Sequence, residues 1–139
     1  MSLTSVVCVI LYIIVDVMYV SASQGFYNNV VERVQGTPIG SIRGTRMIAA
    51  VLSYFIMALG LLVLVFPLID KYIEDSRSPI LAGAMVGAVY GLVMYGVFNF
   101  TLHAMFKGYD LKAVSRDLVW GVSWATVISM LYAFLKMRS

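Results

Sequence analysis

The sequence has 139 residues, of which 61% are hydrophobic and 12% charged, and its formal net charge is +3. Soluble domains usually contain about 45–50% apolar and about 25% charged residues, so a water-soluble monomer and a disordered chain are both excluded. The single cysteine, Cys8, excludes an internal disulfide and a cysteine-based zinc site, and the weak positive charge is typical of membrane loops rather than of a nucleic-acid surface.

Four segments are long and apolar enough to cross a bilayer, because about 20 helical residues span a hydrocarbon core of about 30 Å. These segments cover residues 3–21, 47–69, 80–105 and 117–135. Their apolar runs are continuous rather than alternating, which excludes strands of a β-barrel. We therefore predict one all-α domain over residues 1–139, an antiparallel bundle of four transmembrane helices with both termini on one side.

The first segment carries a polar stripe in which Tyr12, Asp16, Tyr19 and Ser23 follow one another at helical spacing. Asp16 also interrupts the apolar run, and residues 1–7 contain no Lys or Arg, so a cleaved signal peptide is disfavoured. The stripe lies in the half of the span that leads into the first connection.

Residues 22–46 form the longest connection, and apolar side chains recur within it at helical spacing, namely Phe26, Val30, Val31 and Val34. This pattern predicts a short amphipathic helix lying on the membrane between the first two spans. An ordinary helical extension of the first span is the alternative.

Small residues repeat every four positions in the last two segments: Gly83, Gly87 and Gly91 in the third, and Gly121, Ala125, Ser129 and Ala133 in the fourth. Helices in lipid are held together by close van der Waals contact, which small residues permit. We expect these two grooves to dock on each other within the bundle. Self-association into a homo-oligomer is the alternative use of such a groove.

Polar side chains gather at the end of the bundle that carries the first and third connections, here called the loop side. The candidate residues of this cluster are Asp16, Tyr19, Asn99, His103, Asp117 and Trp120. A carboxylate in a bilayer costs roughly 2.5–3.5 kcal/mol on insertion scales, so a membrane-buried acid is informative.

Two interpretations of this cluster remain open. In the functional one, Asp16 is the anion of a pocket open to the loop side, and His103, Arg46 or Lys107 supplies its partner. In the structural one, neighbouring Tyr and Asn side chains bond Asp16 and fix the helix register. Asp117 then caps the fourth helix, and Trp120 is an interfacial anchor.

Basic residues are slightly more numerous on the loop side, with Arg33, Arg43, Arg46, Lys107, Lys112 and Arg116, than on the terminal side, with Lys71, Arg77, Lys136 and Arg138. The positive-inside rule therefore favours a cytoplasmic loop side. Five of the loop-side residues are expected to contact lipid headgroups or a protein partner: Arg43, Arg46, Lys107, Lys112 and Arg116.

Catalysis has little support, because the chain contains one histidine and one cysteine and no nucleophile–base pair or nucleotide-binding fingerprint. We expect no enzymatic activity, no cofactor and no metal site.

Short motifs spread along the chain resemble a family of small four-span membrane proteins catalogued only as a domain of unknown function and found in bacteria and large DNA viruses. The motifs include Asp16 with Tyr19, then Phe26-Tyr27; Tyr54, Gly60 and Pro67; and Asp117 with Trp120-Gly121. The resemblance implies a four-span topology and no established activity.

The chain departs from this family pattern in the third span, where Asn99 stands at a position that tends to be an acid and Leu102 at one that tends to be an amide. These departures weaken a role in proton transfer and favour a structural one. We therefore expect a non-enzymatic component of a larger membrane-associated complex. A viral internal membrane under a capsid is one setting and a cellular plasma or inner membrane the other. The alternative is a small transporter or channel subunit that uses the cluster around Asp16.

Overall fold

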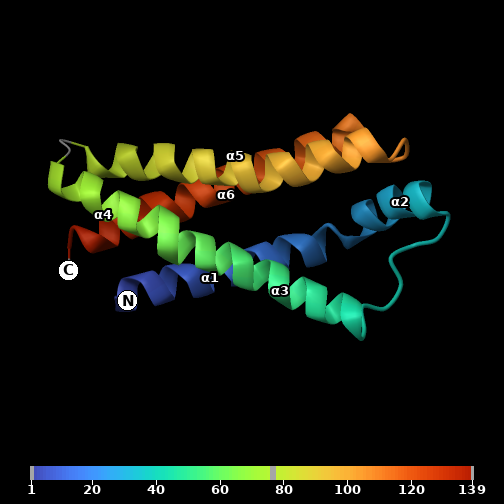
Figure 1. The fold of residues 1–139 in the computed structure, drawn as a ribbon, viewed down its shortest axis with the longest axis horizontal. Coiled ribbons are helices and arrows are strands. Elements are labelled where there is room, and N and C mark those ends of the chain that lie inside the picture. The colour runs from blue at the N-terminus through green and yellow to red at the C-terminus, as the bar shows by residue number, and fades with distance from the viewer. Residues whose placement is uncertain (1, 76–77, 139) are drawn as a thin grey trace.

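The computed structural model describes residues 2–75 and 78–138, and Arg77 of the charge comparison lies outside them. The elements in chain order are α1 (Leu3–Ala22), α2 (Gln24–Gln35), α3 (Thr45–Gly60), the π-helical turn η1 (Leu61–Val65), α4 (Phe66–Asp75), α5 (Pro79–Met105) and α6 (Leu111–Lys136) (Figure 1). Four helical segments are long and apolar enough to cross a membrane: α1, α3 through α4, α5 and α6. The predicted all-α fold with four spanning helices is confirmed.

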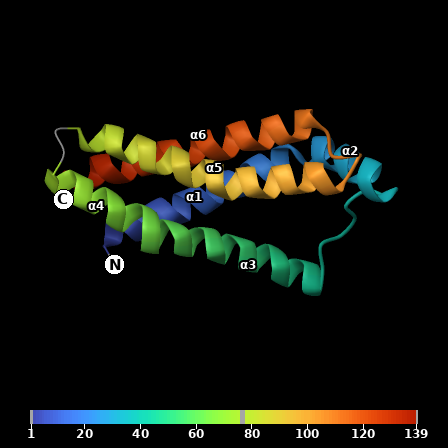
Figure 2. The ribbon, with the colours of Figure 1, turned by 45° about the horizontal axis from the view of Figure 1, so that its top comes forward.

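The helices lie along a common direction, with α5 and α6 side by side over their whole length (Figures 1 and 2). The two ends of the chain lie at the same end of the bundle, as four antiparallel spans require (Figure 1). The opposite end carries α2 and the turn between α5 and α6, and this is the loop side.

Glycines bring α5 and α6 into close contact. A Cβ added at Gly83 would stand 2.8 Å from the carbonyl oxygen of Ser129, and one at Gly91 would stand 2.7 Å from that of Gly121. At Gly87 a Cβ would collide with the Ala125 carbonyl and the Ser129 side chain. The groove of α5 is therefore occupied by α6 of the same chain, which is the intramolecular use that the spacing favoured.

The second span is not a uniform helix. Its π turn, in which the Phe66 N–H donates to the Leu61 carbonyl, ends two residues before Pro67, which has no N–H to donate. After the turn, α4 packs into the bundle, and the buried Phe66 ring stacks on Tyr132 at 4.0 Å between centroids. Before the turn, α3 has no buried residue, and it diverges from α5 toward the loop side (Figures 1 and 2).

The last span begins earlier than the expected Asp117. Helix α6 starts at Leu111, and its N-cap is Asp110, whose Oδ1 accepts a hydrogen bond of 2.9 Å from the Ala113 N–H. Asp117 lies inside the helix and does not cap it. Lys112 and Arg116 consequently belong to α6 rather than to the connection before it.

Helix α2 is a separate element and packs on protein. Its Val30 is 1% exposed and packs in one cluster with Tyr109 of the α5–α6 connection and with Ala113 and Val114 in the first turn of α6. The predicted short helix between the first two spans is confirmed, and its apolar face covers the α5–α6 turn.

Candidate functional site

Asp16 is the centre of the loop-side polar cluster. Its Oδ1 accepts hydrogen bonds of 2.9 Å from the Tyr95 hydroxyl and from Trp120 Nε1, and its Oδ2 accepts one of 3.0 Å from the Tyr54 hydroxyl. These donors come from α5, α6 and α3, while Asp16 itself is on α1 and only 5% exposed. One carboxylate therefore connects all four spans.

None of the basic residues expected beside Asp16 bonds to it. Arg46 donates to the carbonyls of Ile39 and Ser41 in the preceding connection. His103 is exposed, and its Nδ1 lies 2.6 Å from the Tyr109 carbonyl. Lys107 is exposed in the α5–α6 connection. In residues 2–75 and 78–138, the side chains that bond this carboxylate are all neutral donors.

A second carboxylate is held in the same manner. Asp117 Oδ1 accepts from the Tyr27 hydroxyl at 2.9 Å, and its Oδ2 accepts from Asn99 Nδ2 at 2.6 Å. Asn99 is fully buried, and its Oδ1 accepts a short bond from the Tyr109 hydroxyl. Asn99 thus donates to an acid on one side and accepts from a tyrosine on the other, which orients its amide.

Two links join these carboxylate centres. Tyr95 donates its hydroxyl proton to Asp16, and its backbone carbonyl accepts from Asn99 Nδ2 at 2.8 Å. Tyr19 stacks on Trp120 at 4.1 Å between ring centroids, and its hydroxyl lies 3.1 Å from that of Tyr27. We call this set the loop-side network: Asp16, Tyr19, Tyr27, Tyr54, Tyr95, Asn99, Tyr109, Asp117 and Trp120.

Three groups outside the spans, at or beside the edge of the network, have shifted pKa values: Tyr27, Tyr109 and Asp110. Burial raises the pKa of Tyr109 to about 12 and also raises the pKa of Tyr27 above its usual range. The exposed Asp110 has a lowered pKa, first because the Ala113 N–H bonds its carboxylate and then because Arg33 lies 2.8 Å away. The tyrosines therefore remain neutral donors at physiological pH, and Asp110 is ionised.

The structure brings together five of the six residues expected in the cluster, and His103 lies outside it. The predicted set omitted four tyrosines: Tyr27, Tyr54, Tyr95 and Tyr109. The positions of Tyr54 and Tyr95 in the sequence already place them at loop-side depth in the second and third spans, and Tyr95 precedes Asn99 by one helical turn. That both hydroxyls meet Asp16 depends on how the helices cross.

The helix-packing residues lie at the α5–α6 interface. Gly83, Gly87 and Gly91 face α6, Ala125 is fully buried, and a Cβ at Gly121 would overlap the Tyr95 ring. Gly121 thereby makes room for Tyr95, which donates to Asp16, so the close packing of α5 and α6 also positions a member of the loop-side network.

The basic residues expected at headgroups or partners differ in their surroundings. Arg43, Arg46, Lys107 and Lys112 are exposed at the loop side. Arg116 donates to Ser23 Oγ at 3.1 Å, and its guanidinium lies 4.6 Å from the centre of the Phe26 ring. Arg116 therefore fastens α2 to α6 within the chain.

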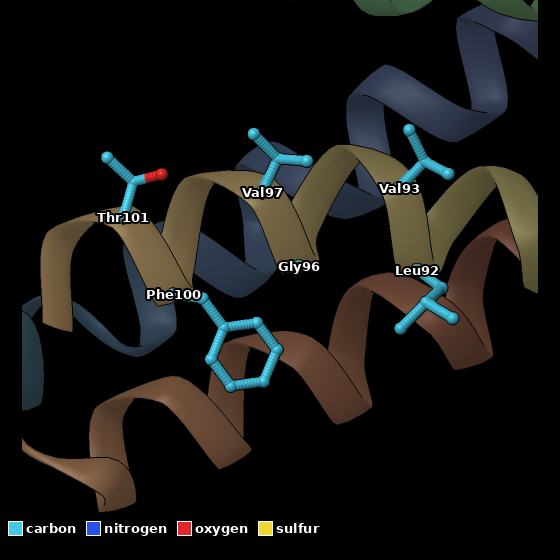
Figure 3. A pocket seen from close by; sticks show the side chains of 6 residues that line it. All are labelled: Leu92, Val93, Gly96, Val97, Phe100 and Thr101. Atoms are coloured by element: carbon cyan, nitrogen blue, oxygen red, sulfur yellow. The ribbon is translucent and has the colours of Figure 1, made fainter. Parts of the chain in front are cut away.

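A hollow of about 610 Å³ lies on the outer face of α5, lined by Leu92, Val93, Gly96, Val97, Phe100 and Thr101 (Figure 3). Val93, Val97 and Thr101 project to one side of Gly96, and Leu92 and Phe100 project to the other (Figure 3). None of these residues belongs to the loop-side network. Within the described residues, no group of three or more His, Cys, Asp or Glu side chains is placed to hold a metal ion.

Comparison with known proteins supports the family indicated by the motifs. Residues 1–134 match the family described as "Predicted membrane protein (DUF2177)". No curated protein and no solved structure matches the chain. Together with the four apolar helices, this match makes the chain a multi-pass integral membrane protein. The chain belongs to the DUF2177 family of membrane proteins.

Proposed function

We propose that this protein is a non-enzymatic structural or assembly component of a larger membrane-associated complex, and that the loop-side network sets the register of its helices. The observation that carries the proposal is that the carboxylates of Asp16 and Asp117 receive their hydrogen bonds from the chain itself. Such a network fastens a bundle, because donors from three other spans take three of the roughly four lone-pair positions of the Asp16 carboxylate.

The groups available for catalysis also support this proposal. Cys8 is fully buried among apolar side chains, away from the network. The imidazole of His103 is directed at a backbone carbonyl rather than at a nucleophile. Tyrosine, tryptophan and asparagine side chains act here as hydrogen-bond donors that position two acids.

Surfaces for assembly lie at the loop side. Arg43, Arg46, Lys107 and Lys112 are exposed there and are suited to anionic headgroups or an acidic partner layer. By the positive-inside rule this side faces the cytoplasm. A viral internal membrane or a cellular plasma or inner membrane would provide such a setting.

The test is to isolate the full chain from its native membrane in a mild detergent, then measure particle mass and identify bound proteins. We expect a particle heavier than the 15.4 kDa monomer with its detergent, containing a reproducible protein partner or further copies of the chain. The Arg43→Gln/Lys107→Gln variant should lose a soluble partner. The matched Arg116→Gln variant should keep it, because Arg116 bonds within the chain. A stable monomer without any partner would refute the proposal.

A second function, proton- or cation-coupled transport, is favoured by one specific observation. In the described part of the chain, no Lys, Arg or His bonds either Asp16 or Asp117, so neither membrane-buried acid has a compensating cation. Intramembrane acids of this kind often mark ion pathways. In liposomes of purified protein, transport predicts a flux that Asp16→Asn abolishes, and absence of flux from the wild type would remove this candidate.

A further inference from the structure

We propose that the loop-side half of the second span, helix α3, is a lateral gate that swings about residues 60–67 and is latched closed by the hydrogen bond from Tyr54 to Asp16. This inference goes beyond the assembly role and does not depend on it. It rests on the contrast between the two halves of one spanning helix.

The half before the π turn is held weakly. Helix α3 has no buried residue, and apolar side chains such as Val51, Phe55 and Ile56 are about 60% exposed. Two side-chain hydrogen bonds join it to other spans within the described residues. One runs from Tyr54 to Asp16 on α1, and the other from Tyr90 on α5 to the Met57 carbonyl near the turn. Tyr54 is therefore the fastening nearest the free end.

The half after the π turn is anchored. Phe66 and Ile69 are at most 1% exposed, and the Phe66 ring stacks on Tyr132 of α6. Tyr132 in turn donates its hydroxyl proton to Asp70 at 2.9 Å. One end of the second span is thus fixed to the α5–α6 pair, so the proposed motion is confined to the part between this anchor and the loop side.

The segment between the two halves has the composition of a hinge. It begins at Gly60, contains the π turn Leu61–Val65 and ends at Pro67, which has no N–H to continue the helical ladder. Proline residues and π turns are the usual causes of bends in helices. Pro67 is exposed on the outer side of this segment, whereas Leu61 and Val65 on its inner side are buried in the core, so the segment can bend while its inner side stays packed.

Opening this gate changes the surroundings of Asp16 selectively. Tyr95 and Trp120 bond Oδ1 from the firmly paired α5 and α6, whereas Tyr54 bonds Oδ2 from α3. Release of Tyr54 would leave Oδ1 bonded and free Oδ2. The other polar groups around Asp16 are the hydroxyls of Tyr12 and Tyr19 on its own helix and Asp117 on α6.

The test measures electron–electron distances between spin labels at the exposed positions Val51 on α3 and Val97 on α5, in lipid nanodiscs and a Cys8→Ala background. A bend change of about 20° at Gly60 would move residue 51, about 13 Å along the helix, by about 5 Å. We expect Tyr54→Phe to lengthen the mean distance by about this amount. The matched control is Tyr132→Phe, which removes the same kind of hydroxyl from Asp70 at the anchored end and should leave the distance unchanged.

Two further arms separate gating from general loosening. A label pair at Leu68 on α4 and Met85 on α5 should keep its distance in Tyr54→Phe, and adding Pro67→Ala should reduce the displacement at Val51. The proposal is overturned if Tyr54→Phe behaves like Tyr132→Phe, or if the Leu68–Met85 distance changes as much as the Val51–Val97 distance. A displacement unaffected by Pro67→Ala would overturn the position of the hinge.

Discussion

Replacing Asp16 tests whether its carboxylate fastens the bundle. Asp16→Ala leaves three donors in the membrane, on Tyr54, Tyr95 and Trp120, without their acceptor. An unsatisfied buried donor costs about 1–3 kcal/mol, and such costs are not fully additive, so we expect Asp16→Ala to destabilise the protein by about 3–6 kcal/mol.

Asp16→Asn should behave differently, because its amide oxygen still accepts from Tyr95 and Trp120, while the Tyr54 hydroxyl can turn and accept from the new NH2 group. Hydrogen bonds to a charged group exceed neutral ones by about 1 kcal/mol each, so three of them lose about 3 kcal/mol. Removal of the charge recovers roughly 2.5–3.5 kcal/mol of insertion cost. The two terms nearly cancel, and we expect Asp16→Asn to lie within about 1 kcal/mol of the wild type.

Unfolding by SDS in mixed micelles, followed by tryptophan fluorescence, measures both variants, because the chain's two tryptophans, Trp120 and Trp124, lie in or beside the network. Asp70→Ala is the matched control, since Asp70 accepts one tyrosine hydroxyl and should lose less stability than Asp16→Ala. Equal stabilities for Asp16→Ala and Asp16→Asn would refute the hydrogen-bonding account.

Three further predictions use the same unfolding measurement. Gly87→Ala should destabilise the protein by about 1–3 kcal/mol through overpacking against Ala125 and Ser129. The control Gly96→Ala should be nearly neutral, because its Cβ would find neighbours no closer than 3.7 Å. Equal effects of the two substitutions would contradict the packing argument. Tyr109→Phe should cost about 1–3 kcal/mol, because Asn99 Oδ1 is buried and loses its donor, and an unchanged stability would show that water replaces the hydroxyl. Asp110 has a lowered pKa in the folded state, so its contribution to the free energy of unfolding is complete above its unfolded pKa of about 4 and is lost as pH falls through the folded pKa. Asp110→Asn should therefore flatten the fall of stability at acid pH. An identical dependence of stability on pH in the variant and the wild type would exclude this linkage.

Helix ends show where local patterns were insufficient. The last span was expected to start at Asp117 because the continuous apolar run begins there. The helix starts at Leu111 instead, because Asp110 caps it and α2 covers its first turns. A membrane span predicted from apolar composition underestimates a helix whose first turns are buried by protein rather than by lipid. The apolar pattern around Val30 predicted the amphipathic helix α2, but its apolar face packs on the α5–α6 turn rather than on the membrane surface.

The composition and periodicity of this chain were enough to determine four spans, a common side for the termini and the docking of the α5 glycines on α6, because insertion and close helix packing depend on residues a few positions apart. Only the tertiary structure decided which donors hold Asp16 and that α3 diverges from the bundle. Those features depend on the rotation and crossing of helices, which arise from contacts between residues 38 to 104 positions apart in sequence. A polar stripe predicts which face of a helix is buried, but the packing of the whole bundle selects the atoms that the stripe meets.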